Sequence, residues 1–101
     1  MAFDLPLPRQ LAKAGWKVKI RDKERLEQPH VTIIKGTACW RLGLRSGAFL
    51  DVESKWKDLP DLLRQIIEKN ENWERLCQAW DQMYPNNRVA GEEEDEDDND
   101  D

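Results

Sequence analysis

The first strong pattern along the chain is an alternation of apolar and basic residues. From Trp16 to Arg21 the sequence reads Trp, Lys, Val, Lys, Ile, Arg. Successive side chains of a β-strand point to opposite faces, so this order places the apolar residues on one face and the basic residues on the other. The segment is therefore predicted to be a strand that packs its apolar face on a core.

Two further strands are predicted after Pro29. Residues 30–35 are rich in β-branched side chains, and residues 38–45 alternate between apolar and other positions. Gly36 and Thr37 favour a short turn between these segments, which are therefore predicted to form a β-hairpin. Residues 49–52 fit either a short fourth strand or an extended loop.

The hydrophobic period changes in the C-terminal half. Apolar residues recur there at the spacing of an amphipathic helix: Leu59, Leu62, Leu63, Ile66 and Ile67. A second apolar stripe runs from Trp73 to Tyr84, and the Asn-Glu-Asn sequence at 70–72 favours a helix boundary between the stripes. Two helices are predicted, with one bent helix as the alternative. The predicted fold class is α+β, a small antiparallel sheet of three or four strands followed by one or two C-terminal helices packed on it.

Composition divides the chain into three parts. Residues 1–13 form an N-terminal segment in which Pro6 and Pro8 oppose regular structure, and the residues after them fit one helical turn ending at Gly15. Residues 14–90 are predicted to form a single α+β domain, because this length supports one small core and excludes large catalytic scaffolds. Residues 91–101 contain nine acidic residues among eleven and are predicted to be a disordered acidic tail.

Charge is distributed unevenly over these parts. The whole chain has a formal net charge of −5, but the tail carries −9 and residues 1–90 carry +4. Positions 9–45 hold ten basic and three acidic residues, so the sheet-forming half is the positive half. Basic side chains about 7 Å apart on one strand face match the needs of phosphate-backbone binding.

The candidate binding residues for nucleic acid or a protein partner lie on the first predicted strand, on its exit and on the second strand of the hairpin. They are Lys17, Lys19, Arg21, Lys23, Arg25 and Arg41. The alternative is an ordinary solvated face of an antiparallel sheet.

Catalytic and metal-binding motifs are not evident in the sequence. His30 is the only histidine, and its spacing from acidic residues matches no common metal site, so neither a metal nor a cofactor is expected. The sequence contains no Gly-rich phosphate loop and no nucleophile motif. Cys39 and Cys77 stand far apart and are predicted to be buried free thiols. Trp16 and Trp40 are predicted to belong to the core, with base stacking as the alternative.

No stretch of the sequence approaches the roughly 18 apolar residues of a membrane span, and Met1 to Pro6 lack the features of a secretory signal. A cytoplasmic location without membrane contact is therefore expected.

The segment from Gln28 to Gly36 resembles a small bacterial family of unknown function whose hallmark is a Pro-Pro-His-Val-His-Val strand. The Arg-Asp at 21–22 and the Trp-Arg-Leu at 40–42 fit the same pattern. The family pattern ends in Leu-x-x-x-Trp-x-x-x-Tyr/Phe, and the chain has this spacing at Leu76, Trp80 and Tyr84.

The resemblance covers about residues 14–84. Pro29, His30 and Val31 match the motif, whereas Gln28 replaces its first proline and Thr32 its second histidine. A function that depends on two alternating histidines is therefore not implied. The resemblance implies a component of a toxin–antitoxin pair, with a protein partner and with RNA as a ligand.

The leading functional interpretation is a non-enzymatic bacterial binding module that contacts a protein partner or nucleic acid through its basic strand. One alternative is a small ribonuclease-type toxin with His30 as acid–base catalyst. Another is a structural homo-oligomer built on a helix face that includes Trp56 or Trp73. For the acidic tail, three roles remain open: solubilisation, competition with a polyanionic ligand, and docking on a basic partner.

Overall fold

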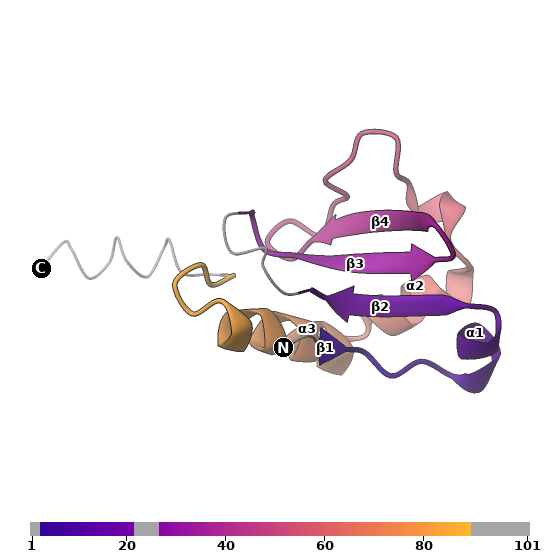
Figure 1. Ribbon diagram of the computed structural model, residues 1–101, viewed down its shortest axis with the longest axis horizontal. Helices are drawn as coiled ribbons and strands as arrows, with labels where there is room; N and C mark the ends of the chain where they lie inside the picture. The colour runs from indigo at the N-terminus through magenta and orange to yellow at the C-terminus, as the bar shows by residue number, and fades with distance from the viewer. Residues whose placement is uncertain (1–2, 22–26, 90–101) are drawn as a thin grey trace, which may run out of the picture.

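The computed structural model describes residues 3–21 and 27–89. Four antiparallel strands form one sheet in the order β1-β2-β3-β4 (Figure 1). Their bounds are β1 Phe3–Asp4, β2 Trp16–Ile20, β3 His30–Lys35 and β4 Ala38–Gly43.

The register of the hairpin agrees with the predicted turn. Lys35 pairs with Ala38, which leaves Gly36 and Thr37 as a two-residue connection. Gly36 has a φ of +61°, a left-handed conformation that a two-residue hairpin turn of this kind demands and that glycine adopts without steric cost. The strands β2, β3 and β4 are thus confirmed.

The fourth strand is not residues 49–52. Phe49 makes only an isolated bridge to Leu42, and the fourth strand is β1, which pairs Phe3 with Ile20. A two-residue strand has no hydrophobic period of its own, so the alternation that identified β2 had nothing to detect there.

Helices follow the strands as predicted, and a short one precedes β2. The helical elements are α1 Arg9–Lys13, the 3₁₀-helix η1 Trp56–Asp58, α2 Asp61–Glu68 and α3 Asn70–Met83. The C-terminal helices are separate because Lys69 has an extended backbone with ψ of 132°. The Asn72 side chain donates a hydrogen bond of 2.9 Å to the Ile66 carbonyl, which satisfies an acceptor at the end of α2.

The core lies between one face of the sheet and the helices. In Figure 1, α2 and α3 lie behind the sheet. From β2, Trp16, Val18 and Ile20 are buried, as the alternation predicts, and from α3 the largest buried residue is Trp80. Trp40 is half-buried and packs on Trp16 with ring centroids 5.6 Å apart, which places both predicted core tryptophans in or against the core.

Residues 84–89 do not leave the domain at the end of α3. The Tyr84 hydroxyl donates a hydrogen bond to the Arg21 carbonyl, and the Asn87 amide donates one of 2.6 Å to the Glu27 carbonyl. The Arg45 guanidinium donates to the Val89 and Arg88 carbonyls at 2.7 Å each. The segment, orange in Figure 1, therefore lies at the end of the sheet where β2 finishes and β3 begins. The predicted acidic tail, residues 91–101, lies outside the described residues.

Candidate binding face

The face of the sheet turned away from α2 and α3 carries the candidate binding residues. We call it the outer sheet face and define it by two rows of cross-strand neighbours. One row is Lys17, Ile34 and Cys39, and the other is Lys19, Thr32 and Arg41. No helix of the described residues lies over this face, which is turned toward the viewer in Figure 1.

The two lysines of β2 remain accessible on this face. Lys17 is exposed and makes no ion pair with the described residues. Lys19 is 31% exposed, and its Nζ lies 3.7 Å from a carboxylate oxygen of Asp4, whose side chain is 70% exposed. A pair this exposed contributes little energy, so Lys19 keeps most of its capacity to bind another anion.

Arg41 is held by carboxylates. Its Nη2 and Nε donate to the two carboxylate oxygens of Asp51 at 2.7 and 3.3 Å, and its Nη1 lies 3.3 Å from Oε1 of Glu27. The hydrogen bond from Arg41 lowers the pKa of Asp51 below its ordinary value. Arg41 lies on the predicted face, but these two carboxylates neutralise its charge locally.

The remaining candidates follow β2. Arg21 is exposed just beyond Ile20, and its carbonyl accepts the hydrogen bond from Tyr84. Lys23 and Arg25 lie outside the described residues. The accessible cationic group of the described outer face is therefore Lys17 and Lys19, extended by Arg21.

A hollow of about 220 Å³ opens beside the two lysines. It is lined by Asp4, Leu5, Leu7, Ala12, Trp16, Lys17, Val18 and Lys19. Its apolar wall comes from the segment after β1, from α1 and from β2. Sequence reasoning missed the hollow because it set residues 1–13 apart from the domain. The signal was present in Leu5 and Leu11, which are buried within the Pro-containing segment and the helical turn.

His30 lies inside the protein. Its side chain is fully buried, its Nδ1 is 2.9 Å from the Gln28 carbonyl, and its ring packs on Trp80 with centroids 5.5 Å apart. Its Nε2 is 3.9 Å from Oε1 of Glu27, the carboxylate that also contacts Arg41. His30 therefore has a neighbouring carboxylate, but bulk solvent and any polymeric substrate are kept from its ring.

The two cysteines form no disulfide and differ in burial. Cys77 is half-buried, and burial, together with Asp81 and Glu74, raises the pKa of its thiol. Cys39 is exposed, so the prediction of a buried thiol is wrong at this position. Cys39 pairs with Ile34 on the outer sheet face, which no described helix covers.

Within residues 3–21 and 27–89 no group of three or more His, Cys, Asp or Glu side chains is arranged to hold a metal ion.

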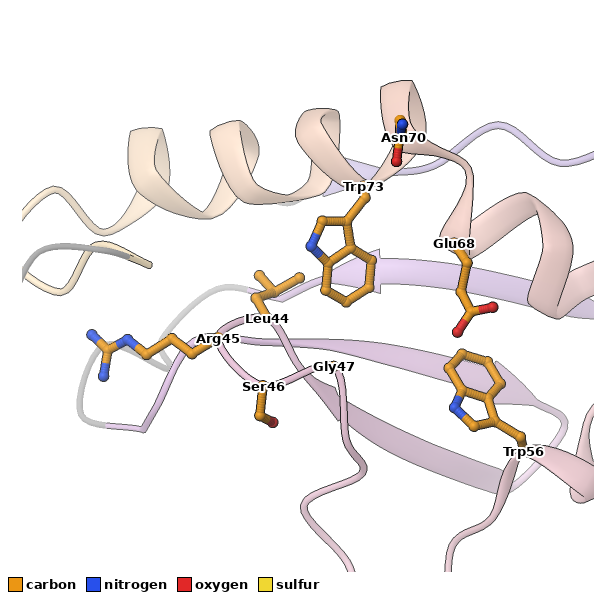
Figure 2. Close-up of a pocket in the computed structure, with 8 residues that line it drawn as sticks. All are labelled: Leu44, Arg45, Ser46, Gly47, Trp56, Glu68, Asn70 and Trp73. Atoms are coloured by element: carbon orange, nitrogen blue, oxygen red, sulfur yellow. The ribbon is translucent and has the colours of Figure 1, made fainter.

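A larger cleft of about 440 Å³ lies between the segment after β4 and the helices (Figure 2). We call it the tryptophan cleft. It is lined by Leu44, Arg45, Ser46, Gly47, Trp56, Glu68, Asn70 and Trp73. Trp56 and Trp73 are both half-buried, and Trp56 is further packed by Phe49 at 5.0 Å and by the Arg64 guanidinium at 4.9 Å.

Comparison of the chain with known protein families, with curated proteins and with solved structures gives no match. Among the described residues, no helix is long and apolar enough to span a membrane.

Proposed function

We propose that the protein is a non-catalytic binding module whose outer sheet face binds nucleic acid. The observation that carries the proposal is the accessibility of Lys17 and Lys19 on a face that no described helix covers. The two side chains are two residues apart on one strand, about 7 Å, and Arg21 continues the series. Several such cations on one face attract a polyanion through its phosphates and release its counterions.

The surroundings of the two lysines fit a flexible polyanion better than a small ion. The lysines border the 220 Å³ hollow, whose wall includes Leu5, Leu7 and Trp16. An unstacked base can insert its ring into the hollow while the lysines contact the neighbouring phosphates. Single-stranded nucleic acid has unpaired bases, so it can use both the hollow and the lysines.

The alternative of a ribonuclease with His30 as catalyst is disfavoured by burial. A general base must reach the proton it abstracts, within hydrogen-bond distance or through one water. His30 is 0% exposed and stacks on Trp80, so no ribose hydroxyl approaches it without opening the core.

The resemblance at residues 28–36 supports the further proposal that the module belongs to a toxin–antitoxin-like or regulatory system.

The test is fluorescence anisotropy of a labelled 12-nucleotide single strand titrated with the full chain. The variant Lys17→Ala/Lys19→Ala should bind at least tenfold more weakly. The matched control is Lys55→Ala/Lys57→Ala, which removes two exposed lysines at the same spacing at the 3₁₀-helix η1. Equal losses in the two variants would show that binding depends only on total charge and would overturn the proposal.

A protein partner is the second candidate, and the tryptophan cleft favours it. Tryptophan is enriched at the energetic centres of protein interfaces, and Trp56 and Trp73 present part of their surface in one cleft. If the partner is a second copy of the chain, light scattering after size exclusion should give a dimer that Trp73→Ala dissociates. A monomer for both the parent chain and Trp73→Ala would contradict a dimer formed through the tryptophan cleft.

A further inference from the structure

Residues 84–89 are fixed at the end of the sheet where β2 finishes and β3 begins. Val89 is tied down at both backbone groups, because its N–H donates to an Asp81 carboxylate oxygen at 2.8 Å and its carbonyl accepts from Arg45 at 2.7 Å. Asn87 is bonded to the Glu27 carbonyl. The Glu27 side chain in turn contacts Arg41, a member of the outer sheet face. Val89, the last described residue, therefore lies at the end of the sheet where β2 finishes and β3 begins.

The length of the following segment is sufficient to cover the face. Twelve residues follow Val89, and an extended chain of that length spans about 40 Å. Lys17 is four residues from Arg21, or about 13 Å along β2. The Arg21 carbonyl accepts the hydrogen bond from Tyr84, at the start of residues 84–89. Nothing in the length of the chain prevents contact with either lysine.

Charge selects the face as the partner for this segment. Residues 91–101 carry nine carboxylates, whereas the accessible cations of the outer sheet face are Lys17 and Lys19, extended by Arg21. The tryptophan cleft is a poorer partner, because Glu68 lies in its wall and Arg45, the cation that also lines it, already donates to the Val89 and Arg88 carbonyls. A tethered segment is present at a millimolar effective concentration, so even weak carboxylate–lysine contacts become populated at low ionic strength.

We propose that residues 91–101 dock on the outer sheet face and compete there with nucleic acid. The inference rests on the proposed function for its regulatory meaning, but the docking itself is a property of the chain alone. The occupied face binds a polyanion weakly, and a ligand must displace the segment to bind. Salt weakens both contacts, so the competition is strongest at low ionic strength.

Zero-length carbodiimide cross-linking of the full chain tests the docking without any ligand. The reagent joins a carboxylate to a lysine amine in direct contact, and peptide mass spectrometry identifies the pair. The expected product links residues 91–101 to Lys17 or Lys19, forms equally at low and high protein concentration and disappears in 0.5 M salt. Links to Lys55 and Lys57 that equal those to Lys17 and Lys19, or no links at all, would overturn the docking.

A segment of unchanged length with four carboxylates in place of nine tests the competition. In this variant the five residues Glu92, Glu93, Glu94, Asp95 and Glu96 become Gln or Asn. At low salt it should bind the labelled single strand about tenfold more tightly than the parent chain, and the difference should vanish in 0.5 M salt. Equal affinities at low salt would overturn the competition.

The failures of the two proposals give different results. If the cross-links form but neither chain binds nucleic acid, the docking stands and the proposed function fails. If Lys17 and Lys19 are needed for binding but the cross-links are absent, the proposed function stands and the docking fails. A segment that only repels the ligand at a distance would weaken binding without forming the cross-links, and this result also counts against docking.

Discussion

Arg41 and Asp51 are joined by a two-point contact, in which Nη2 and Nε of the guanidinium donate to the two carboxylate oxygens at 2.7 and 3.3 Å. Arg41 belongs to β4, and Asp51 belongs to the loop between β4 and η1. The pair fixes that loop against the edge of the sheet. It also distinguishes Arg41 from the lysines of the same face, because Arg41 has two carboxylate partners, whereas Lys19 has one, the exposed Asp4 at 3.7 Å.

Replacing Arg41 should therefore change stability more than ligand affinity. Arg41 and Asp51 are 40% and 33% exposed, and exposed pairs with good geometry are worth about 0.5–1 kcal/mol. A double-mutant cycle of Arg41→Gln and Asp51→Asn, followed by urea unfolding, should give a coupling energy in that range. Affinity for the single strand should fall less than threefold in Arg41→Gln. A larger loss of affinity, with unchanged stability, would make Arg41 a ligand-binding residue.

The same pair predicts a pH dependence. The hydrogen bond from Arg41 lowers the pKa of Asp51 in the folded protein, so the contribution to stability is present above the unfolded pKa, near pH 4. It is lost as the pH falls through the lower folded pKa. The stability difference between the parent chain and Asp51→Asn should be constant from pH 5 to 7 and shrink below about pH 4. A stability difference that grows as the pH falls would mean that folding raises the pKa of Asp51, which contradicts the prediction.

Substitution of His30 should affect the fold and not a reaction. The ring is fully buried against Trp80, so His30→Ala leaves a cavity, loses the Nδ1 contact to Gln28 and should cost about 2–4 kcal/mol in urea unfolding. The parent chain should leave a labelled RNA uncut over hours. RNA cleavage by the parent chain that His30→Ala abolishes, in a variant still folded by circular dichroism, would restore the ribonuclease interpretation.

The two thiols should react at different rates. Cys39 is exposed, whereas Cys77 is half-buried, and its raised pKa leaves less of the reactive thiolate at neutral pH. Iodoacetamide at pH 7.5 should therefore label Cys39 at least about tenfold faster than Cys77, as followed by peptide mass spectrometry. Equal labelling rates would contradict the partial burial of the Cys77 side chain on α3.

The position of Cys39 also makes it a reporter for the outer sheet face. Cys39 shares a cross-strand row with Lys17 and Ile34, so a nucleic acid strand bound there covers the thiol. A saturating single strand should slow the labelling of Cys39 and leave the labelling of Cys77 unchanged. Protection of neither thiol at saturation would place the bound strand elsewhere on the molecule.

Much of the fold follows from local patterns. The alternation from Trp16 to Arg21 matches the burial of β2, and the two helical stripes match α2 and α3. The same alternation, applied to Ala38, Trp40 and Leu42, places Cys39 on the opposite face, so its exposure was readable from the sequence. Its apolar neighbours led to the wrong prediction.

Other features depend on contacts between distant parts of the chain. Glu27 and Asp51 meet Arg41 from positions 14 and 10 residues away, and such partners leave no periodic signal. Leu5 and Leu7 line the hollow because β1 adds to the sheet next to Lys19, a pairing too short to predict from hydrophobicity. The sequence thus predicted that Lys17 and Lys19 share one face of β2, while the residues that border them and the charge available around them required the tertiary structure.

The most direct test of binding by the outer sheet face is the salt dependence of affinity for the single strand. Each phosphate contact to a single strand contributes about 0.7 to the slope of log K against log salt concentration. Lys17→Ala/Lys19→Ala should therefore reduce the slope by about 1.4, whereas Lys55→Ala/Lys57→Ala should leave it unchanged. Parallel slopes for the parent chain and the Lys17/Lys19 variant would mean that these lysines contact no phosphate, which contradicts the proposed binding face.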